Sequence, residues 1–318
     1  MASEIRIATV TLNPATDETC QVQNFHAGQV NRVTDVQCDA GGKGVYAAAF
    51  LAQYGHRVAA TGLLGRVNPA PFESLFSDLG IEDRFVRVPG RTRMNVKLVD
   101  RIRELVTEIN YPGIRASEES VAEAMAQVDR LADEGVRWFV LAGSLPRGVS
   151  PDIYRHLIEA LKAKDCKVVL DTSGVPFDRA LPAVPTVIKP NIAELHEIVG
   201  TPLDSHAEIV SAARGLAGGG IELSVVSMRE KGALFITQDR AVLAVPPKAR
   251  IASTVGAGDA MVAGVSHGIL SGMELPEIAR LSTAFSLGAL GQLGPNLPPS
   301  EDIDAFAELV EVTELSGV

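Results

Sequence analysis

The sequence predicts an α/β fold built on a mainly parallel sheet with helices on both faces. The first supporting observation is that short runs of β-branched and aliphatic residues alternate with longer segments of helical periodicity. The second is a length of 318 residues of which 46% are apolar, enough for a substantial core and too many for a disordered chain. The third is that aromatic residues are sparse and small apolar residues abundant, which suits helices packed closely on a sheet.

The elements of the main sheet follow in chain order. Strands are predicted at residues 5–11, 58–64, 138–142, 167–171, 186–188, 223–227 and 241–245. Helices are predicted at residues 45–54, 117–133, 152–163, 207–217, 259–270 and 275–290. Because strands that alternate with helices form βαβ units, we expect the strands to run mostly parallel and to be covered on both sides.

Two segments, residues 19–40 and 85–111, break this rhythm. Both alternate polar and apolar residues in the manner of strands, with little helical pattern between them. We expect them to form a small second β-sheet that serves as a lid or a dimer surface. The α/β core then comprises residues 1–18, 41–84 and 112–318. The alternative is that both segments are edge strands of the main sheet.

Charge and cysteine content exclude several classes of protein. A net charge of −10 makes the chain a poor partner for nucleic acid or an anionic membrane. Cys20, Cys38 and Cys166 form no C-x-x-C pair, which argues against a disulfide framework and favours the cytoplasm. Glu4 and Arg6 interrupt any signal-peptide pattern, and no apolar run is long enough to span a bilayer. We therefore expect a cytoplasmic protein with no nucleic-acid or membrane partner.

The sequence G-A-G-D at residues 256–259 opens a predicted helix and is the first candidate for chemistry. Glycines let backbone N–H groups approach a ligand, and the helix N-terminus adds positive potential that favours an anion. An ionised Asp259 beside such a turn could accept the proton of an attacking hydroxyl during phosphoryl transfer. The alternative is an ordinary helix start. A dinucleotide fingerprint is disfavoured because Met261 occupies the position of its third glycine, and no Walker-A pattern occurs.

A second glycine-rich turn, G-G-K-G at residues 41–44, leads into the predicted helix at 45–54. Backbone N–H groups of this turn and the ammonium of Lys43 could hold a polar or anionic substrate. The alternative is a flexible loop with a solvated lysine.

A basic strand supplies the third candidate. Seven basic residues and one acidic residue lie between Arg84 and Arg103, although the whole chain is acidic. Alternation places Arg93 and Lys97 on one face of the strand. Like charges on one face repel each other unless an anion lies among them, so we expect a phosphate over Arg93 and Lys97. The alternative is a solvated face paired with acidic residues.

The fourth candidate is Lys189-Pro190-Asn191 with Glu194, just after a short predicted strand. Asn191 and Glu194 stand three residues apart at a helix start, so their side chains converge and could orient Mg²⁺ through water. The alternative is a helix cap in which the two residues satisfy each other's backbone. Weaker signals at strand ends are Asp17, residues 143–148 and residues 171–174.

Together these motifs resemble the ribokinase-like, phosphofructokinase-B (PfkB) family of carbohydrate kinases, and the match runs nearly end to end. The resemblance rests on T-L-N-P-A-x-D at 11–17, R-T-R-M-N-V-K-L at 91–98, G-S-L-P at 143–146 and S-T-V-G-A-G-D at 253–259. Within the family, the motifs are most similar to those of the 1-phosphofructokinases, with the tagatose-6-phosphate kinases as near relatives. The resemblance implies a ribokinase-like core with a β-lid, and ATP-dependent, Mg²⁺-dependent phosphorylation of a phosphorylated ketohexose. Fructose 1-phosphate, converted to fructose 1,6-bisphosphate, is the first candidate substrate.

The resemblance also implies roles for individual residues. Asp259 would be the base, and an anion hole would be formed by Gly256, Ala257 and Gly258. The phosphosugar would be contacted by Asp17, Gly42, Lys43, Arg93, Lys97 and Ser144. ATP would be contacted by Lys189, Asn191, Glu194, Ser227, Gly232, Ser253 and Thr254. Mg²⁺ would be held indirectly by Glu194 through water, and a homodimer could form through the lid.

Two positions depart from the family pattern. Tyr46 stands where G-G-K-G-x-N usually has an asparagine that helps to bind sugar hydroxyls. Arg229 replaces the first glycine of the nucleotide loop S-x-G-x-x-G. These departures motivate a second hypothesis, a sugar-phosphate-binding homologue with weak catalysis. The intact turn at 256–259 argues against it, because a pure binder needs no base.

Overall fold

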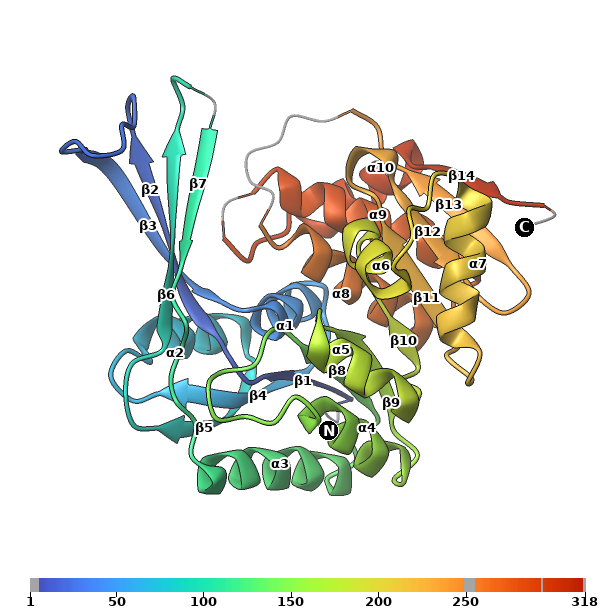
Figure 1. Ribbon diagram of the computed structural model, residues 1–318, viewed down its shortest axis with the longest axis horizontal. Helices are drawn as coiled ribbons and strands as arrows, with labels where there is room; N and C mark the ends of the chain where they lie inside the picture. Colours follow the sequence, from blue (N-terminus) through green and yellow to red (C-terminus); the bar gives the residue numbers. More distant parts are fainter. Residues whose placement is uncertain (1–5, 104, 249–254, 293, 317–318) are drawn as a thin grey trace.

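The computed structural model of the chain describes residues 6–103, 105–248, 255–292 and 294–316. Its large sheet has the strand order β14-β13-β12-β11-β10-β9-β8-β1-β4-β5 (Figure 1). The strands are β1 (Ile7–Thr11), β4 (Val58–Gly65), β5 (Glu82–Val88), β8 (Trp138–Ala142), β9 (Lys167–Asp171), β10 (Val187–Ile188), β11 (Leu223–Ser227), β12 (Ala233–Ile236), β13 (Ala241–Val245) and β14 (Glu311–Glu314). The stretch from β11 through β10, β9, β8, β1 and β4 to β5 is parallel, whereas β12 to β14 add antiparallel pairs.

Helices cover both faces of this sheet. They are α1 (Lys43–Gln53), α2 (Ala70–Leu79), α3 (Glu118–Asp133), α4 (Ile153–Lys162), α5 (Val175–Ala180), α6 (Ile192–Val199), α7 (His206–Ala217), α8 (Ala257–Leu270), α9 (Leu275–Leu290) and α10 (Ser300–Leu309). One core cluster joins α1, α8 and α9 to side chains such as Ile7 and Val140, and another joins α3 and α4 to Ala8 and Phe139. Neighbouring residues of one strand thus enter opposite layers, as the pleat requires. The predicted α/β architecture is confirmed.

A separate sheet with the order β3-β2-β6-β7 projects from the core at the left of Figure 1. Its strands are β2 (Ala15–Val22), β3 (Val33–Gly41), β6 (Arg93–Asp100) and β7 (Leu105–Asn110). Strand β2 pairs with β3 antiparallel and with β6 parallel. The sheet therefore contains strands from both predicted lid segments, residues 19–40 and 85–111. The expectation that both would be edge strands of the main sheet does not hold for these four strands.

The strands differ from the expected lid segments at their boundaries. The second sheet begins at Ala15 rather than at residue 19, and residues 85–88 belong to β5, which pairs with β4 in the main sheet. Polar–apolar alternation is the same in a lid strand and in an edge strand, so it could not mark where one ends and the other begins. Our division of the chain into core and lid remains an interpretation.

Several short elements had no clear signal in the sequence. They are α2, α5, α10, β12 and β14. Each has ten residues or fewer, which gives helical or strand periodicity little length in which to appear. Within the described part of the chain, no helix is long and apolar enough to cross a membrane.

Candidate active site

The turn at residues 256–259 forms the start of α8, which packs in the same core layer as α1. Gly256 precedes the helix with φ 80°, a left-handed conformation that favours glycine. A β-carbon at Gly256 would also approach the Phe50 ring within 3.2 Å. Asp259 lies in the first turn of α8 with only 8% of its surface exposed. The helix start therefore presents backbone N–H groups and a buried carboxylate at the same place.

A second buried carboxylate, Asp171, lies at the carboxyl end of β9. Its Oδ1 atom is 2.9 Å from Nζ of Lys43, the first residue of α1, and 3.5 Å from Nζ of Lys189, just after β10. A β-carbon on Gly258 would lie 3.4 Å from the same Lys189 ammonium. The carboxyl ends of parallel strands thus bring both predicted lysines to the turn of α8. Asp171 was missing from the predicted site, and its only signal was its place at a strand end.

These charges move the pKa values of the two carboxyl groups in opposite directions. Burial and the nearby charge of Asp171 raise the pKa of Asp259 to about 7, although Lys43 and Lys189 oppose the rise. Burial would raise the pKa of Asp171 as well, but Lys189 and Lys43 outweigh it and hold that pKa below its usual value. Burial would lower the pKa of Lys43, but Asp171 and Asp259 raise it above its ordinary range. The cluster therefore contains a firmly ionised carboxylate and a carboxyl group that titrates near neutrality.

The second sheet contributes a third carboxylate, Asp17, which is also buried. Strand pairing places Asp17 opposite Asn95, whose side chain donates a 2.8 Å hydrogen bond to Oδ1. The ammonium of Lys97 lies 3.5 Å from Oδ2, and the Tyr46 hydroxyl donates to the same oxygen at 2.7 Å. Charges at Asp17 and Asp259 influence each other, since Asp17 also raises the pKa of Asp259.

Arg93 lies at the foot of β6, beside the turn that follows β8. Its Nε and Nη2 atoms donate to the carbonyl of Asn13 at 3.3 and 3.1 Å. The Asn13 side chain in turn donates to Ser144 Oγ at 3.1 Å. Burial lowers the pKa of Arg93. No carboxylate forms an ion pair with Arg93 in the described ranges, so the positive charge of its guanidinium is available to bind an anion.

Comparison with known proteins assigns the family. The model of the pfkB family of carbohydrate kinases matches residues 9–302. The chain belongs to the PfkB family of carbohydrate kinases. It is 48% identical over 314 residues to a 1-phosphofructokinase of Rhodobacter capsulatus, with 99% of each chain covered. It is 39% identical over 310 residues to a 1-phosphofructokinase of Vibrio cholerae, which covers 98% of this chain and 97% of the relative.

Solved PfkB and ribokinase structures share the fold. The phosphofructokinase-2 from Escherichia coli in complex with substrates and products superposes with a TM-score of 0.89 at 26% identity, covering 96% of this chain and 99% of that chain. Arabidopsis thaliana ribokinase complexed with ribose and ATP superposes with a TM-score of 0.77 at 20% identity, covering 96% and 99%. The predicted ribokinase-like fold and PfkB membership are confirmed.

The basic run of this PfkB kinase divides into two parts. Arg84 and Arg87 belong to β5 of the main sheet, where Arg84 pairs with Glu134 at 2.9 Å and Arg87 pairs with Asp83. The paired alternative therefore holds for these two arginines. On β6, Lys97 also pairs with an acidic residue of its own sheet, since its Nζ atom lies 3.5 Å from Asp17. Arg93 has only carbonyl partners in the described structure, so the expected anion site reduces to Arg93.

Asn191 and Glu194 form the helix cap that the sequence allowed. Asn191 Oδ1 accepts from the Glu194 backbone at 2.9 Å, and Glu194 Oε2 accepts from the Asn191 backbone at 2.8 Å. The Ser227 backbone donates to the carbonyl of Pro190 at 3.2 Å, which places the end of β11 beside this cap. In the described ranges, no three His, Cys, Asp or Glu side chains could together hold a metal ion.

The predicted nucleotide loop follows β11. Gly232 has φ 88°, and a β-carbon there would meet the Ala244 carbonyl at 2.1 Å, so the position requires glycine. Arg229, which replaces a family glycine, has φ 55° and so adopts a conformation that costs a non-glycine residue energy. Ser253 and Thr254, the remaining predicted nucleotide contacts, lie outside the described residues.

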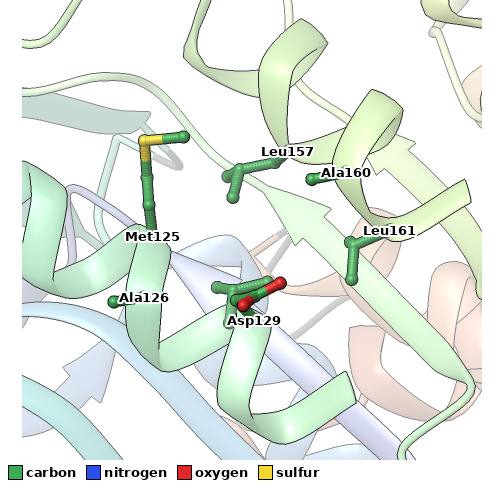
Figure 2. A pocket seen from close by; sticks show the side chains of 7 residues that line it. Met125, Ala126, Asp129, Leu157, Ala160 and Leu161 are labelled. Carbon is green, nitrogen blue, oxygen red and sulfur yellow. The ribbon is translucent and has the colours of Figure 1, made fainter. Parts of the chain in front are cut away.

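Two hollows lie away from the carboxylate cluster. Figure 2 shows the first, an open apolar hollow between α3 and α4 that Met125 and Leu157 border. Its acidic residue, Asp129, pairs with Lys164 and has no other charged neighbour along the hollow. The second has a volume of about 490 Å³ and lies between α9, α10 and the chain that leaves β13 at Lys248. None of the residues that line this second hollow belongs to the carboxylate cluster.

Proposed function

We propose that this PfkB kinase transfers a phosphoryl group from ATP to fructose 1-phosphate, with Asp259 as the general base. The observation that carries the proposal is Asp259 itself, a buried carboxyl group of raised pKa at the N-terminus of α8. Relatives named 1-phosphofructokinase, alike over nearly the whole chain, support the choice of sugar. Tagatose 6-phosphate remains the alternative substrate.

The chemistry requires one proton acceptor and several positive groups. The acceptor hydroxyl gives its proton to Asp259 while its oxygen forms a bond to the γ-phosphorus, and the bond from that phosphorus to the ADP oxygen breaks. Backbone N–H groups of Gly256, Ala257 and Gly258 stabilise the charge on the transferring group. Lys43 and Lys189 add positive charge on the side of Asp171. Groups that a fold holds in fixed positions stabilise developing charge with little cost of reorganisation.

On the sugar side, we assign the substrate phosphate to Arg93 and Ser144. The guanidinium of Arg93 uses only carbonyl partners in the described structure, and Ser144 lies within the same hydrogen-bonded group. Asp17 and Lys97, which form an ion pair beside Gly41, are assigned to the sugar hydroxyls. Gly42 and Lys43 complete this side.

On the nucleotide side, we assign the phosphates to Lys189 and the α6 cap formed by Asn191 and Glu194. Ser227 and Gly232, with Ser253 and Thr254, are assigned to the rest of the nucleotide. Mg²⁺, when bound, neutralises phosphate charge. The residues fit a weakly held ion, because Asp171 Oδ2 is a buried acceptor without a partner in the described structure. Glu194 would hold the ion through water.

A homodimer through the second sheet and a cytoplasmic location complete the proposal. Val36, Leu105 and Ile109 are apolar and exposed on this sheet, and a second copy of the chain could cover them. Cys20, Cys38 and Cys166 are free thiols, which supports a reducing compartment. Sedimentation equilibrium of the purified chain would give the mass of the assembly.

The test is a panel of acceptors assayed for ADP release. Fructose 1-phosphate should give the highest kcat/KM, above tagatose 6-phosphate, fructose 6-phosphate and unphosphorylated fructose. A higher value for tagatose 6-phosphate would transfer the assignment to the alternative substrate. Tight binding without ADP release for every acceptor would refute the kinase activity.

A matched pair of variants tests the substrate phosphate. Arg93→Ala should raise KM for fructose 1-phosphate roughly tenfold or more, since a charge-assisted contact contributes about 1.5–3 kcal/mol. Arg87→Ala removes an arginine from the same basic run but one that pairs with Asp83, so KM should stay within about twofold. Equal effects of the two variants would contradict the placement of the phosphate at Arg93.

A further inference from the structure

Tyr46 is a buried phenol within the candidate site for which the mechanism above has no role. It lies in the first turns of α1, directly after the turn at 41–44, and only 3% of its surface is exposed. Its hydroxyl donates a 2.7 Å hydrogen bond to Asp17 Oδ2. The ring packs against Phe50, with centroids 6.2 Å apart. A buried tyrosine hydroxyl with a single short bond to a carboxylate acts on that carboxylate more than on the core.

Asp17 depends on its donors because it is a buried carboxylate. Burial of a charged group is unfavourable unless hydrogen bonds replace the lost water. The described structure provides three donors: Asn95 and Lys97 from β6, and Tyr46 from α1. The first two belong to the same sheet as Asp17, whereas Tyr46 belongs to a helix of the core. The Tyr46 hydroxyl therefore forms the hydrogen bond that links the Asp17 carboxylate of the second sheet to helix α1 of the core.

The Tyr46 ring also borders both glycine-rich turns. A β-carbon on Gly256 would lie 3.7 Å from Tyr46 Cδ2, so the ring is adjacent to the start of the α8 turn. A β-carbon on Gly41 would lie 2.6 Å from the Asp17 carboxylate, so that carboxylate is adjacent to the other turn. Tyr46 thus donates to the carboxylate assigned to the sugar and lies beside the turn assigned to the transferred phosphoryl group.

We propose that Tyr46 is a positioning residue for the sugar, which orients the Asp17 carboxylate through its hydroxyl so that the unused lone pairs of Asp17 face the sugar hydroxyls. This inference rests on the proposed function, because it assigns a supporting residue to the sugar side of that site. A carboxylate has about four lone-pair positions, and three donors leave room for a ligand hydroxyl. Without the phenol, Asp17 can rotate away and must be reoriented when the sugar binds, which weakens binding.

The test is Tyr46→Phe, which removes the hydroxyl and keeps the ring that packs against Phe50. We expect KM for fructose 1-phosphate, and its dissociation constant measured calorimetrically without ATP, to rise about tenfold to a hundredfold, as for loss of a hydrogen bond to a charged group. KM for ATP and kcat should change by less than about threefold. An unchanged dissociation constant, or a change in kcat alone, would overturn the proposal.

Tyr54→Phe is the matched control. Tyr54 follows the last turn of the same helix, and its hydroxyl donates to Asp304 at 3.2 Å, remote from Asp17. This variant should leave both sugar constants unchanged. An equal rise in the control would attribute the effect of Tyr46→Phe to a general change in α1 and overturn the proposal.

A double-variant cycle separates positioning from direct contact. If Tyr46 acts through Asp17, Tyr46→Phe should weaken sugar binding much less when Asp17 is already asparagine. Full additivity would indicate that the phenol contacts the sugar independently and would overturn the positioning role. Tyr46→Met provides a second side chain without a hydroxyl, and failure of both variants to fold would assign the hydroxyl to stability instead. A wild-type protein that binds the phosphosugar without turnover would refute the kinase activity and leave the binding cycle readable.

Discussion

The end of β9 and the start of α8 each bury one carboxylate, and the pKa values of the two groups are shifted in opposite directions. Asp171 is 1% exposed and has the ammonium groups of Lys43 and Lys189 within 3.5 Å. Asp259 is buried nearly as deeply, but in the described ranges both lysines form their ion pairs with Asp171 instead. The same chemical group is therefore kept ionised at one position and has a pKa of about 7 at the other, as the base that we propose requires.

The first prediction concerns the loss of the base. Asp259→Asn should lower kcat by roughly 10²–10⁴-fold, the contribution typical of a positioned general base. KM for both substrates should change little, because the turn and the cations remain. Steady-state kinetics with fructose 1-phosphate and ATP measure both constants. Near-full activity of this variant would break the comparison, because Asp259 would then be only another buried carboxylate.

The second prediction concerns stability, for which we expect the change at Asp171 to have a larger effect than the change at Asp259. Asp171→Asn leaves two lysines without their buried counter-ion, so the free energy of unfolding should fall by about 3 kcal/mol. Asp259→Asn should be at least as stable as the wild type at pH 8, because it removes a carboxylate whose ionised form is disfavoured by its site. Urea unfolding at pH 8 measures both variants. A loss of stability in Asp259→Asn equal to that in Asp171→Asn would contradict the contrast.

The third prediction concerns pH and has the smallest effect. Since only ionised Asp259 accepts a proton, kcat/KM should rise with pH and level off above an apparent pKa near the value of about 7. The charge of Asp171 raises the pKa of Asp259, so Asp171→Asn should shift this limb to lower pH. Lys43 lowers the pKa of Asp259, so Lys43→Met should shift the limb to higher pH. Shifts in the same direction would show that the two residues do not act through charge.

The sequence predicted the regular part of the fold well. The predicted strands at 138–142, 167–171 and 223–227 and the helix at 275–290 have the bounds found in the structure. These elements are long or continuously apolar, so their period alone identifies them. Edge strands and short helices gave weaker patterns, and residues 85–88 of β5 were therefore grouped with the lid.

The candidate site was predicted in part. The glycine-rich turns, the lysines and Asp259 could be proposed because each occupies a distinctive local pattern. Asp171 gave only a weak signal, because a single aspartate at the end of a strand resembles many others until Lys43 and Lys189 are seen beside it. The basic run shows the same limit, since Arg87 and Arg93 belong to one run of basic residues and have different partners.

By itself, the sequence determined the α/β class, the family and the residues at the ends of strands and the starts of helices, because these depend on local periodicity and motif. Only the tertiary structure decided which charges meet. The pairing of Asp171 with two lysines, and of Asp17 with Tyr46, joins residues that lie between 18 and 128 positions apart along the chain. Electrostatic interaction depends on distance and burial in three dimensions, and neither can be inferred from separation along the chain.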